Sequence, residues 1–266
     1  MRTHMHETLR VMREAIAAGL SDKDARSHSG MSGGNACRMK SFIDSGSIED
    51  NVYNRATVYA LATSETNANM GKIVAAPTAG ASGILPAVLI AFSELNRVDD
   101  ERVVDALYLT GDIGMKIAKT ASLSGAECGC QAECGSAAAM AAAGLAFLMG
   151  GTYEQSENAA ALALKSLLGL VCDPVAGLVE VPCIKRNATG TSVAITSANM
   201  SMAGIESVIP FDEVLVAMKQ VGRTMPEQLR ETAQGGCAVT ATGMRIARSL
   251  GLKQRRGDES GTFVRE

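Results

Sequence analysis

At the centre of this 266-residue sequence stands Ser136-Ala-Ala-Ala-Met-Ala-Ala-Ala-Gly-Leu-Ala-Phe-Leu-Met149, a run that carries no charged residue. A helix needs roughly 20 apolar residues to cross a bilayer, whereas this run is shorter and is interrupted by Gly144. The run therefore predicts the buried central helix of a helical bundle. Hydrophobic residues make up 47% of the chain but aromatic residues only 3%, so small aliphatic side chains must fill the core. We expect an all-α fold.

Helical spacing of apolar residues continues on both sides of this run. It predicts helices over residues 3–20, 48–70, 84–92, 98–124 and 154–170. Further on, we expect two short helices within 204–218, separated by Pro210, and a last helix over 227–248 that Gly235-Gly236 interrupts. Residues 187–203 mix small polar and apolar side chains, and no strand-like alternation of useful length occurs. The chain is expected to form one domain, residues 1–266, with 252–266 as a mobile tail.

Charge and cysteine content limit the class of function and the compartment. The formal net charge is -3, and the sequence has no basic stripe with interleaved aromatic residues, so nucleic-acid binding is not expected. The chain has seven cysteines, an odd number, and no secretory leader, which indicates a reducing compartment. We therefore expect a cytoplasmic protein without a membrane anchor.

Five of the seven cysteines flank the alanine-rich run. They lie in Gly125-Ala-Glu-Cys-Gly-Cys-Gln-Ala-Glu-Cys-Gly135 before it and in Cys172-Asp-Pro-Val-Ala-Gly-Leu-Val-Glu-Val-Pro-Cys183 after it. Thiolates are the soft ligands of iron-sulfur clusters and zinc, and the neighbouring glycines and prolines provide constrained, close-approaching backbone. Cys130 and Cys134 are spaced i, i+4, so on a helix they share one face.

Two other interpretations of these cysteines compete with a cluster. Free cysteines are often simply small buried apolar residues, but this is a weaker account of Cys134, Cys172 and Cys183 taken together. Structural zinc sites show two pairs of closely spaced ligands. Here Cys128 and Cys130 are too close for such a pair, and ten residues separate Cys172 from Cys183. The spacing favours an iron-sulfur cluster over zinc.

A second stretch of interest is the loop of small residues at 73–83, which leads into the predicted helix with Pro86 in its first turn. Unpaired N–H groups and a positive dipole end at such a place suit a carboxylate. We expect Thr78, Ser82 and the N–H groups near Gly80 and Gly83 to hold the carboxylate of a substrate. A tight turn between packed helices is the alternative.

Several blocks together resemble a known family. They are Asn67-Ala-Asn-Met-Gly-Lys-Ile-Val-Ala-Ala-Pro-Thr-Ala-Gly80, Ser82-Gly-Ile-Leu-Pro86, Gly129-Cys-Gln-Ala-Glu133, Cys172-Asp-Pro-Val-Ala-Gly-Leu-Val179 and Val181-Pro-Cys-Ile-Lys-Arg-Asn187. These blocks are similar to the iron-sulfur-dependent L-serine dehydratases, in particular the alpha chain of the two-chain branch. The resemblance extends from about Met12 to about Met244.

The resemblance implies a 4Fe-4S cluster with one iron available to L-serine, which is dehydrated and deaminated to pyruvate and ammonia. Cys172 and Cys183 match ligand positions of the family. The first ligand of the single-chain branch falls at Ala138, so Cys134, one helical turn earlier, is the expected third ligand and Cys130 its substitute. The terminal cysteine that acts as fourth ligand there has no counterpart in Phe263-Val-Arg-Glu266. The fourth position is therefore open, or filled by water, Cys128, Cys130 or a partner chain.

The proton acceptor is not fixed by the sequence. Lys72, His28 and Asp173 are the candidate catalytic residues, with Glu133 and Lys185 as further possibilities. His28 lies in a stretch of turn formers, Ser21 to Asn35, which is either a substrate-facing loop or a solvated connection. Asn67 and Asn187 suit hydrogen bonds to the substrate or within the loop.

Other functions and a partner follow from the same residues. A pyridoxal-phosphate mechanism would need a Schiff-base lysine beside a glycine-rich phosphate cup, and neither Lys72 nor Lys185 has such a setting. An L-cysteine desulfidase with the same type of cluster, or a non-catalytic iron-sulfur or zinc redox sensor, is the alternative function. Because the single-chain enzymes carry an additional domain, the resemblance also implies a separately encoded beta chain in a hetero-oligomer.

Overall fold

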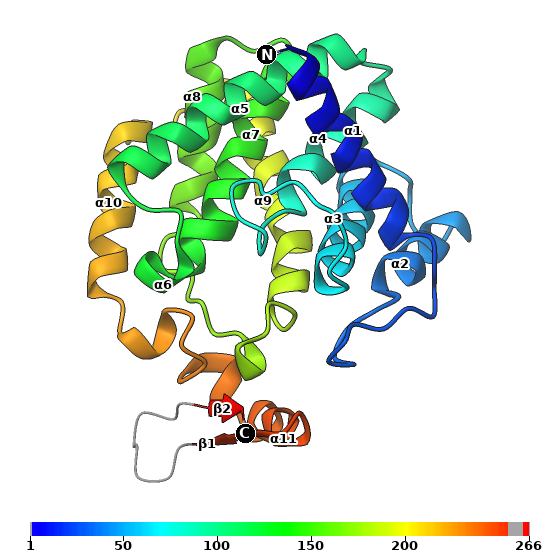
Figure 1. Ribbon diagram of the computed structural model, residues 1–266. Helices are drawn as coiled ribbons and strands as arrows, with labels where there is room; N and C mark the ends of the chain where they lie inside the picture. Colours follow the sequence, from blue (N-terminus) through cyan, green and yellow to red (C-terminus); the bar gives the residue numbers. More distant parts are fainter. Residues whose placement is uncertain (1, 255–262, 266) are drawn as a thin grey trace.

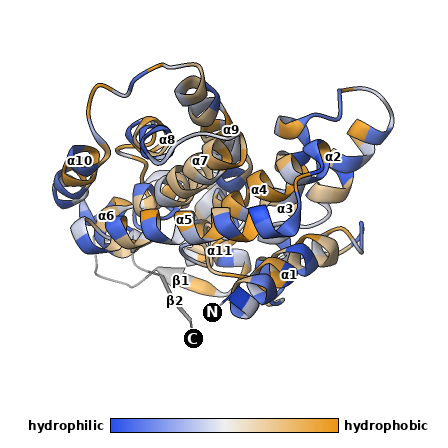
Figure 2. Ribbon diagram, turned by 90° about the horizontal axis from the view of Figure 1, so that it is seen from above, coloured by the Kyte–Doolittle hydropathy of each residue, from blue (hydrophilic) through white to orange (hydrophobic). Residues whose placement is uncertain are grey.

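The structure, a computed structural model, describes residues 2–254 and 263–265. The fold is a bundle of α-helices arranged around α7 (Ser136–Leu148), the alanine-rich run, as Figure 1 shows. Around α7 pack α4 (Ile84–Asn96), α5 (Asp100–Thr120), α8 (Tyr153–Lys165) and α9 (Cys183–Met202). Seen from above, α7 lies in the middle of these four helices (Figure 2). The all-α class and the buried central helix are thus confirmed.

The small side chains of α7, mostly alanine with one glycine, allow the neighbouring helices to approach it closely. All residues of α7 except Phe147 are buried. At Gly144 an added Cβ would lie 2.7 Å from Cγ2 of Thr110 in α5 and 3.0 Å from Cδ2 of Leu89 in α4. Helices with small residues at their contacts approach closely, so the core achieves dense packing without aromatic bulk.

The outer helices begin at residues that cap them. Asp99 accepts a hydrogen bond from the Arg102 N–H at the start of α5, and Thr152 forms a capping box with Gln155 at the start of α8. The amphipathic α1 (Arg2–Gly19) packs along α3 (Val52–Ala68), with α2 (Asn35–Asp44) on the other side of α3. Helix α2 was not predicted.

The second half of the chain differs from the sequence expectation in three places. Helix α9 includes residues 187–203 almost entirely, because hydroxyls such as that of Thr191 donate to carbonyls of the preceding turn instead of disrupting it. Residues 204–209 form a loop, and Pro210 starts one helix, α10 (Phe211–Thr224), rather than separating two. The predicted last helix is two 3-10 turns, η3 (Glu227–Leu229) and η4 (Gly236–Val239), followed by α11 (Ala241–Ser249).

The chain ends in a short antiparallel pair, β1 (Leu252–Gln254) with β2 (Phe263–Arg265), which the sequence pattern does not indicate. Of the predicted mobile tail, residues 255–262 and 266 lie outside the described residues. Three-residue strands are too short to show an alternating pattern. Within the described part of the chain, no helix combines the length and the apolar character needed to cross a membrane.

Candidate functional site

Four buried cysteines converge where α7, α9 and the loop before α9 meet: Cys130, Cys134, Cys172 and Cys183. Cys130 and Cys134 lie just before and within η1 (Gln131–Gly135), a π-helical turn that joins α6 (Gly125–Cys128) to α7. Such turns are rare in proteins overall, and those that occur often lie at functional sites. The i, i+4 spacing of the two cysteines suggests ordinary α-geometry here, which the π-turn replaces.

The thiols influence one another's protonation. The thiols of Cys134 and Cys172 hydrogen-bond to Cys130, and together with the nearby Arg186 they hold the pKa of Cys130 well below its usual range. The same hydrogen bonds raise the pKa of Cys134 and of Cys172. Burial and the negative charge of Cys130 raise the pKa of Cys183 to about 12. The four side chains therefore form one thiol set, a soft donor group of the kind that holds iron-sulfur clusters or zinc.

Cys128 does not belong to this set. An added Cβ at Gly222 of α10 would lie 2.4 Å from the Cys128 sulfur, so this thiol is packed against α10. Its pKa is raised chiefly by burial and by Glu127. Two of the predicted alternatives for a fourth ligand are thus separated in the structure. Cys130 lies with the other thiols, whereas Cys128 packs against α10.

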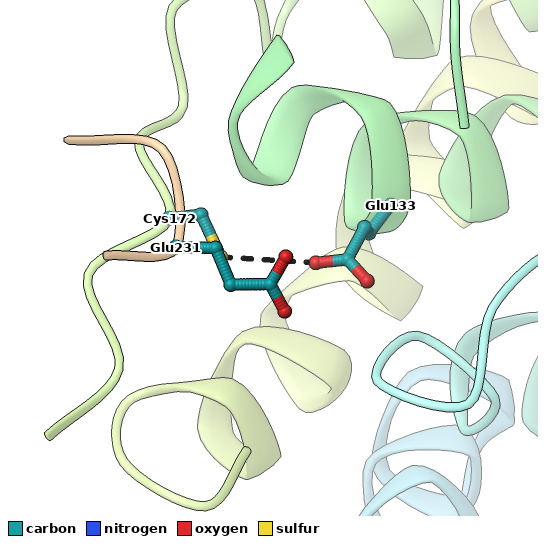
Figure 3. Close-up of side chains that lie close together, drawn as sticks. All are labelled: Glu133, Cys172 and Glu231. Carbon is teal, nitrogen blue, oxygen red and sulfur yellow. Dashed lines mark hydrogen bonds between the residues drawn. The ribbon is translucent and has the colours of Figure 1, made fainter. Parts of the chain in front are cut away.

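Two carboxylates approach the thiol set at Cys172, as Figure 3 shows. One ligand atom each from Glu133, Cys172 and Glu231 lies within 4.8 Å of the other two, so this group could hold a metal ion. The Cys172 thiol lies 3.8 Å from Oε2 of Glu133. Glu231 is brought there by backbone pairing, since its N–H donates to the Cys172 carbonyl at 2.8 Å and the Cys172 N–H donates to the Leu229 carbonyl at 2.8 Å.

The surroundings of Glu133 favour its neutral form. Burial, the charge of Cys130 and the neighbouring Glu231 raise the pKa of Glu133 to about 7, against hydrogen bonds from Thr78 and Cys172 that favour the charged form. The Thr78 hydroxyl donates to Oε1 of Glu133 at 3.0 Å. Through Glu133, Thr78 connects the predicted substrate loop to the Cys172 thiol.

Asn187 holds the predicted substrate loop against α9. Its Nδ2 donates to the Gly80 carbonyl at 2.7 Å and to the Cys183 carbonyl at 3.0 Å, and its Oδ1 accepts from the Gly83 N–H at 2.9 Å. The Gly83 N–H, expected from the sequence to hold a substrate carboxylate, is therefore bonded to Asn187. On the other side of the loop, Asn67 donates to the Ala79 carbonyl at 3.1 Å.

The remaining loop residues differ in their contacts. Ser82 is buried, and its hydroxyl has no hydrogen-bond partner among the described residues. An added Cβ at Gly80 would lie 3.3 Å from Oε1 of Glu133. The absence of a side chain at Gly80 therefore makes room for the Glu133 carboxylate. Thr78, Gly80 and Asn187 all lie close to the thiol set.

The three predicted catalytic residues lie in different surroundings. Asp173 is buried, forms an ion pair with Arg186 at 2.9 Å and accepts the Cys237 N–H at 2.6 Å. His28 is exposed and lines a cavity of about 420 Å³ together with Glu180 and other residues of the segment between Cys172 and Cys183. Lys72 is exposed near α1, where Arg10 and, to a smaller extent, Lys72 lower the pKa of Glu7.

The sequence pattern gives no indication of Glu231. Glu231 follows η3 in left-handed backbone conformation (φ 63°), next to Arg230, which forms a parallel bridge with Cys172. The Glu231 N–H donates to the Cys172 carbonyl, and Cys172 is distant in sequence. No local spacing could have pointed to it. Glu133, in contrast, lies beside Cys134 in the cysteine block and is predicted only as one of several proton acceptors.

Comparison with known proteins gives this geometry a context. The family model described as serine dehydratase alpha chain matches residues 1–238. The chain is 48% identical over 247 residues to the probable L-serine dehydratase, alpha chain, of Bacillus subtilis strain 168, covering 92% of this chain and 82% of that protein. It is 47% identical over 251 residues to the L-serine dehydratase, alpha chain, of Peptoniphilus asaccharolyticus, covering 94% and 86%.

Longer proteins match over part of their length. L-serine dehydratase TdcG of Escherichia coli K12 is 46% identical over 191 residues, which are 71% of this chain and 42% of that protein. The matched family model covers both cysteine blocks and the loop of Thr78. On this match and these identities, the chain belongs to the serine dehydratase alpha chain family.

Proposed function

We propose that the protein is an L-serine dehydratase that releases pyruvate and ammonia from L-serine without pyridoxal phosphate. The names of its relatives support the substrate and the reaction. The structural observation that carries the proposal is the meeting of the buried thiol set with the loop of Thr78 and Gly80, through Glu133. A metal-dependent lyase requires a set of metal ligands next to a loop that can bind a small substrate.

The proposed cofactor is a 4Fe-4S cluster held by Cys134, Cys172 and Cys183, with Cys130 beside them. The donors fit such a group, because they are buried thiols from separate segments, and Cys134 and Cys172 hydrogen-bond to the neighbouring Cys130, whose pKa is lowered. When bound, the cluster supplies a Lewis acid for the β-hydroxyl, turning it into a better leaving group.

The protein's own residues are proposed to bind and orient the substrate. The Ser82 hydroxyl, which has no partner among the described residues, the backbone N–H near Gly80 and the Thr78 hydroxyl on release from Glu133 take the α-carboxylate. Asn67 and Asn187 keep the loop in place by bonding its carbonyls. Glu133 and Thr78 together fix the side of the substrate that faces the thiols.

Of the predicted proton acceptors, His28 is the proposed one. It lines the cavity beside the segment that joins Cys172 to Cys183, whereas Asp173 is engaged by Arg186 and Cys237 and Lys72 lies near α1. Lys72 and Asp173 remain predictions.

The proposal includes a partner and a compartment. Relatives that are named alpha chains support a separately encoded beta chain, with which this chain would form a hetero-oligomer. All seven cysteines, each within the described residues, are free thiols. Free thiols are typical of a reducing compartment, and we propose the cytoplasm.

The test is anaerobic purification together with the co-expressed partner chain. Iron, zinc and sulfide content and pyruvate release from L-serine are measured on one sample, and sulfide release from L-cysteine on a second. The proposal expects close to four irons and four sulfides per chain, by the cluster type, together with pyruvate. Zinc without iron, an intact cluster that releases no pyruvate, or sulfide from L-cysteine in place of pyruvate would refute it.

A further inference from the structure

Two polar side chains, the buried Gln131 and the largely buried Arg186, connect the segments that carry the thiol set. Neither belongs to the thiols or to the substrate loop. Each contacts backbone within three residues of Cys172, which lies on another segment. Their role is visible only in the folded chain, since their partners are distant in sequence.

Gln131 connects the π-turn to the segment before Cys172. Its side chain is fully buried, with a relative exposure of 0%. Its Oε1 accepts the Gly169 N–H at 3.0 Å, and its own N–H donates to the Leu170 carbonyl at 3.0 Å. Its Nε2 donates to the Met218 carbonyl of α10 at 3.0 Å. Because Gln131 lies between Cys130 and Cys134, these bonds fix both cysteines relative to Cys172.

Arg186 makes the corresponding connection between Cys172 and Cys183. It lies on α9, one turn after Cys183, and its side chain is only 18% exposed. One guanidinium nitrogen donates to the Val171 carbonyl at 2.8 Å, and the other forms the ion pair with Asp173 at 2.9 Å. Arg186 thus contacts both neighbours of Cys172, the Val171 carbonyl before it and the Asp173 carboxylate after it.

We propose that Gln131 and Arg186 are positioning residues that hold the cysteine-bearing segments in the arrangement required for metal binding. This inference rests on the proposed function insofar as the thiol set is taken to bind metal. It does not depend on which amino acid is dehydrated. The apoprotein is therefore the right material for the test.

The experiment compares Gln131→Met, Arg186→Met and Arg186→Lys with the wild type. Anaerobic apoprotein is titrated with Co²⁺, and the thiolate-to-metal charge-transfer absorption gives the affinity and the intensity per bound metal. Outer-shell substitutions typically cost about 10- to 100-fold in metal affinity, and we expect losses of this size for both methionine variants. Arg186→Lys keeps the charge but not the two-point contact, so it should recover only part of the affinity.

Arg102 provides a matched control. It also donates from a partly buried guanidinium to a backbone carbonyl, that of Phe147, at 2.9 Å, and it lies over the Phe147 ring at 3.8 Å. Arg102→Met and Arg102→Lys should lower the thermal midpoint without changing the Co²⁺ titration. Co²⁺ affinity and band intensity at wild-type values in Gln131→Met and both Arg186 variants would overturn the inference, as would an equal loss in the Arg102 variants.

The outcomes also separate this inference from the proposed function. Wild-type apoprotein that binds neither Co²⁺ nor a reconstituted cluster would refute the metal site itself. Normal binding by the wild type and reduced binding by the variants, with no pyruvate formed, would support the positioning role and refute the dehydratase. If Arg186→Met does not fold, Arg186→Lys against Arg102→Lys still decides the question.

Discussion

At the scale of single residues, the position of the Glu133 carboxylate depends on a glycine. An added Cβ at Gly125 would lie 2.7 Å from Oε2 of Glu133 and 3.1 Å from Oε2 of Glu231. Gly125→Ala should therefore displace the end of the Glu133 side chain while the fold is kept. Since a misplacement of about 1 Å can cost about 100-fold in rate, we expect a large loss of kcat/KM for pyruvate release with little change in thermal midpoint.

Gly111 in α5 is the matched control for this substitution, because a Cβ there meets no atom within 4 Å. Gly111→Ala should leave kcat/KM unchanged. Equal activity of the Gly125→Ala and Gly111→Ala enzymes would show that the exact place of Glu133 is unimportant.

The cysteines provide a second prediction at this scale. Cys183→Ser should lose most of the iron and sulfide of the reconstituted protein, because its thiol belongs to the set around Cys130. Cys128→Ser should retain them, because its thiol packs against Gly222. Iron and sulfide per chain are measured after identical reconstitution. A cluster lost from both variants would mean that Cys128 also takes part.

The residues of the site are predictable only where the local sequence shows their chemistry. Cys172 and Cys183 can be identified from the sequence because each thiol has glycines or prolines close by. The sequence around Glu231 has no such feature, because Glu231 reaches Cys172 only through backbone pairing between two segments distant in sequence. The left-handed conformation of Glu231 is likewise a property of the folded loop.

At the scale of the helices, the dense contact between α7 and its neighbours leads to a stability prediction. Gly144→Ala would place a Cβ within 3.0 Å of both Thr110 and Leu89. Overpacking of a dense core typically costs about 1–3 kcal/mol, and we expect a loss of free energy of unfolding in this range by chemical denaturation. Gly111→Ala, in open space, should instead stabilise by about 0.4–1 kcal/mol. A stabilising effect at both positions would contradict the packing described for α7.

The helices themselves are predicted unevenly by the sequence, for physical reasons. The alanine-rich run indicates α7 because only a buried helix tolerates so few polar residues. Helix α9 is not predicted from the sequence, since its serines and threonines resemble a loop until their hydroxyls bond the preceding turn. Pro210 suggests a break in the sequence pattern, although proline is as well suited to begin a helix as to interrupt one.

At the scale of the whole molecule, exposed ion pairs fasten α1 across the start of α5. Arg13 pairs with Asp100 at 2.5 Å, and Arg2 pairs with Glu101 at 2.6 Å and with Asp105 at 3.0 Å. Hydrogen bonds from Arg13 and Arg2 lower the pKa of Asp100 and of Glu101 respectively. A lowered carboxyl pKa stabilises the fold fully above the unfolded value of about 4, and this stabilisation is lost as the pH falls through the folded value.

The pH prediction follows from this sign. Asp100→Asn should destabilise the protein slightly at pH 6, where the Arg13 pair is intact, and the difference from wild type should shrink towards zero below about pH 4. The free energy of unfolding of both proteins is measured by denaturant titration at several pH values and low salt. A difference that stays constant down to acidic pH would exclude the pair as its source.

The backbone bridge at Cys172 also sets an order of events during protein synthesis. The ribosome makes all four cysteines of the thiol set before it makes Met218, Leu229 and Glu231, to which Gln131 and Cys172 are hydrogen-bonded. A nascent chain that ends before Met218 carries all four cysteines of the thiol set without these final partners. The hydrogen bonds that hold the thiol set can therefore be complete only after the ribosome has made Glu231.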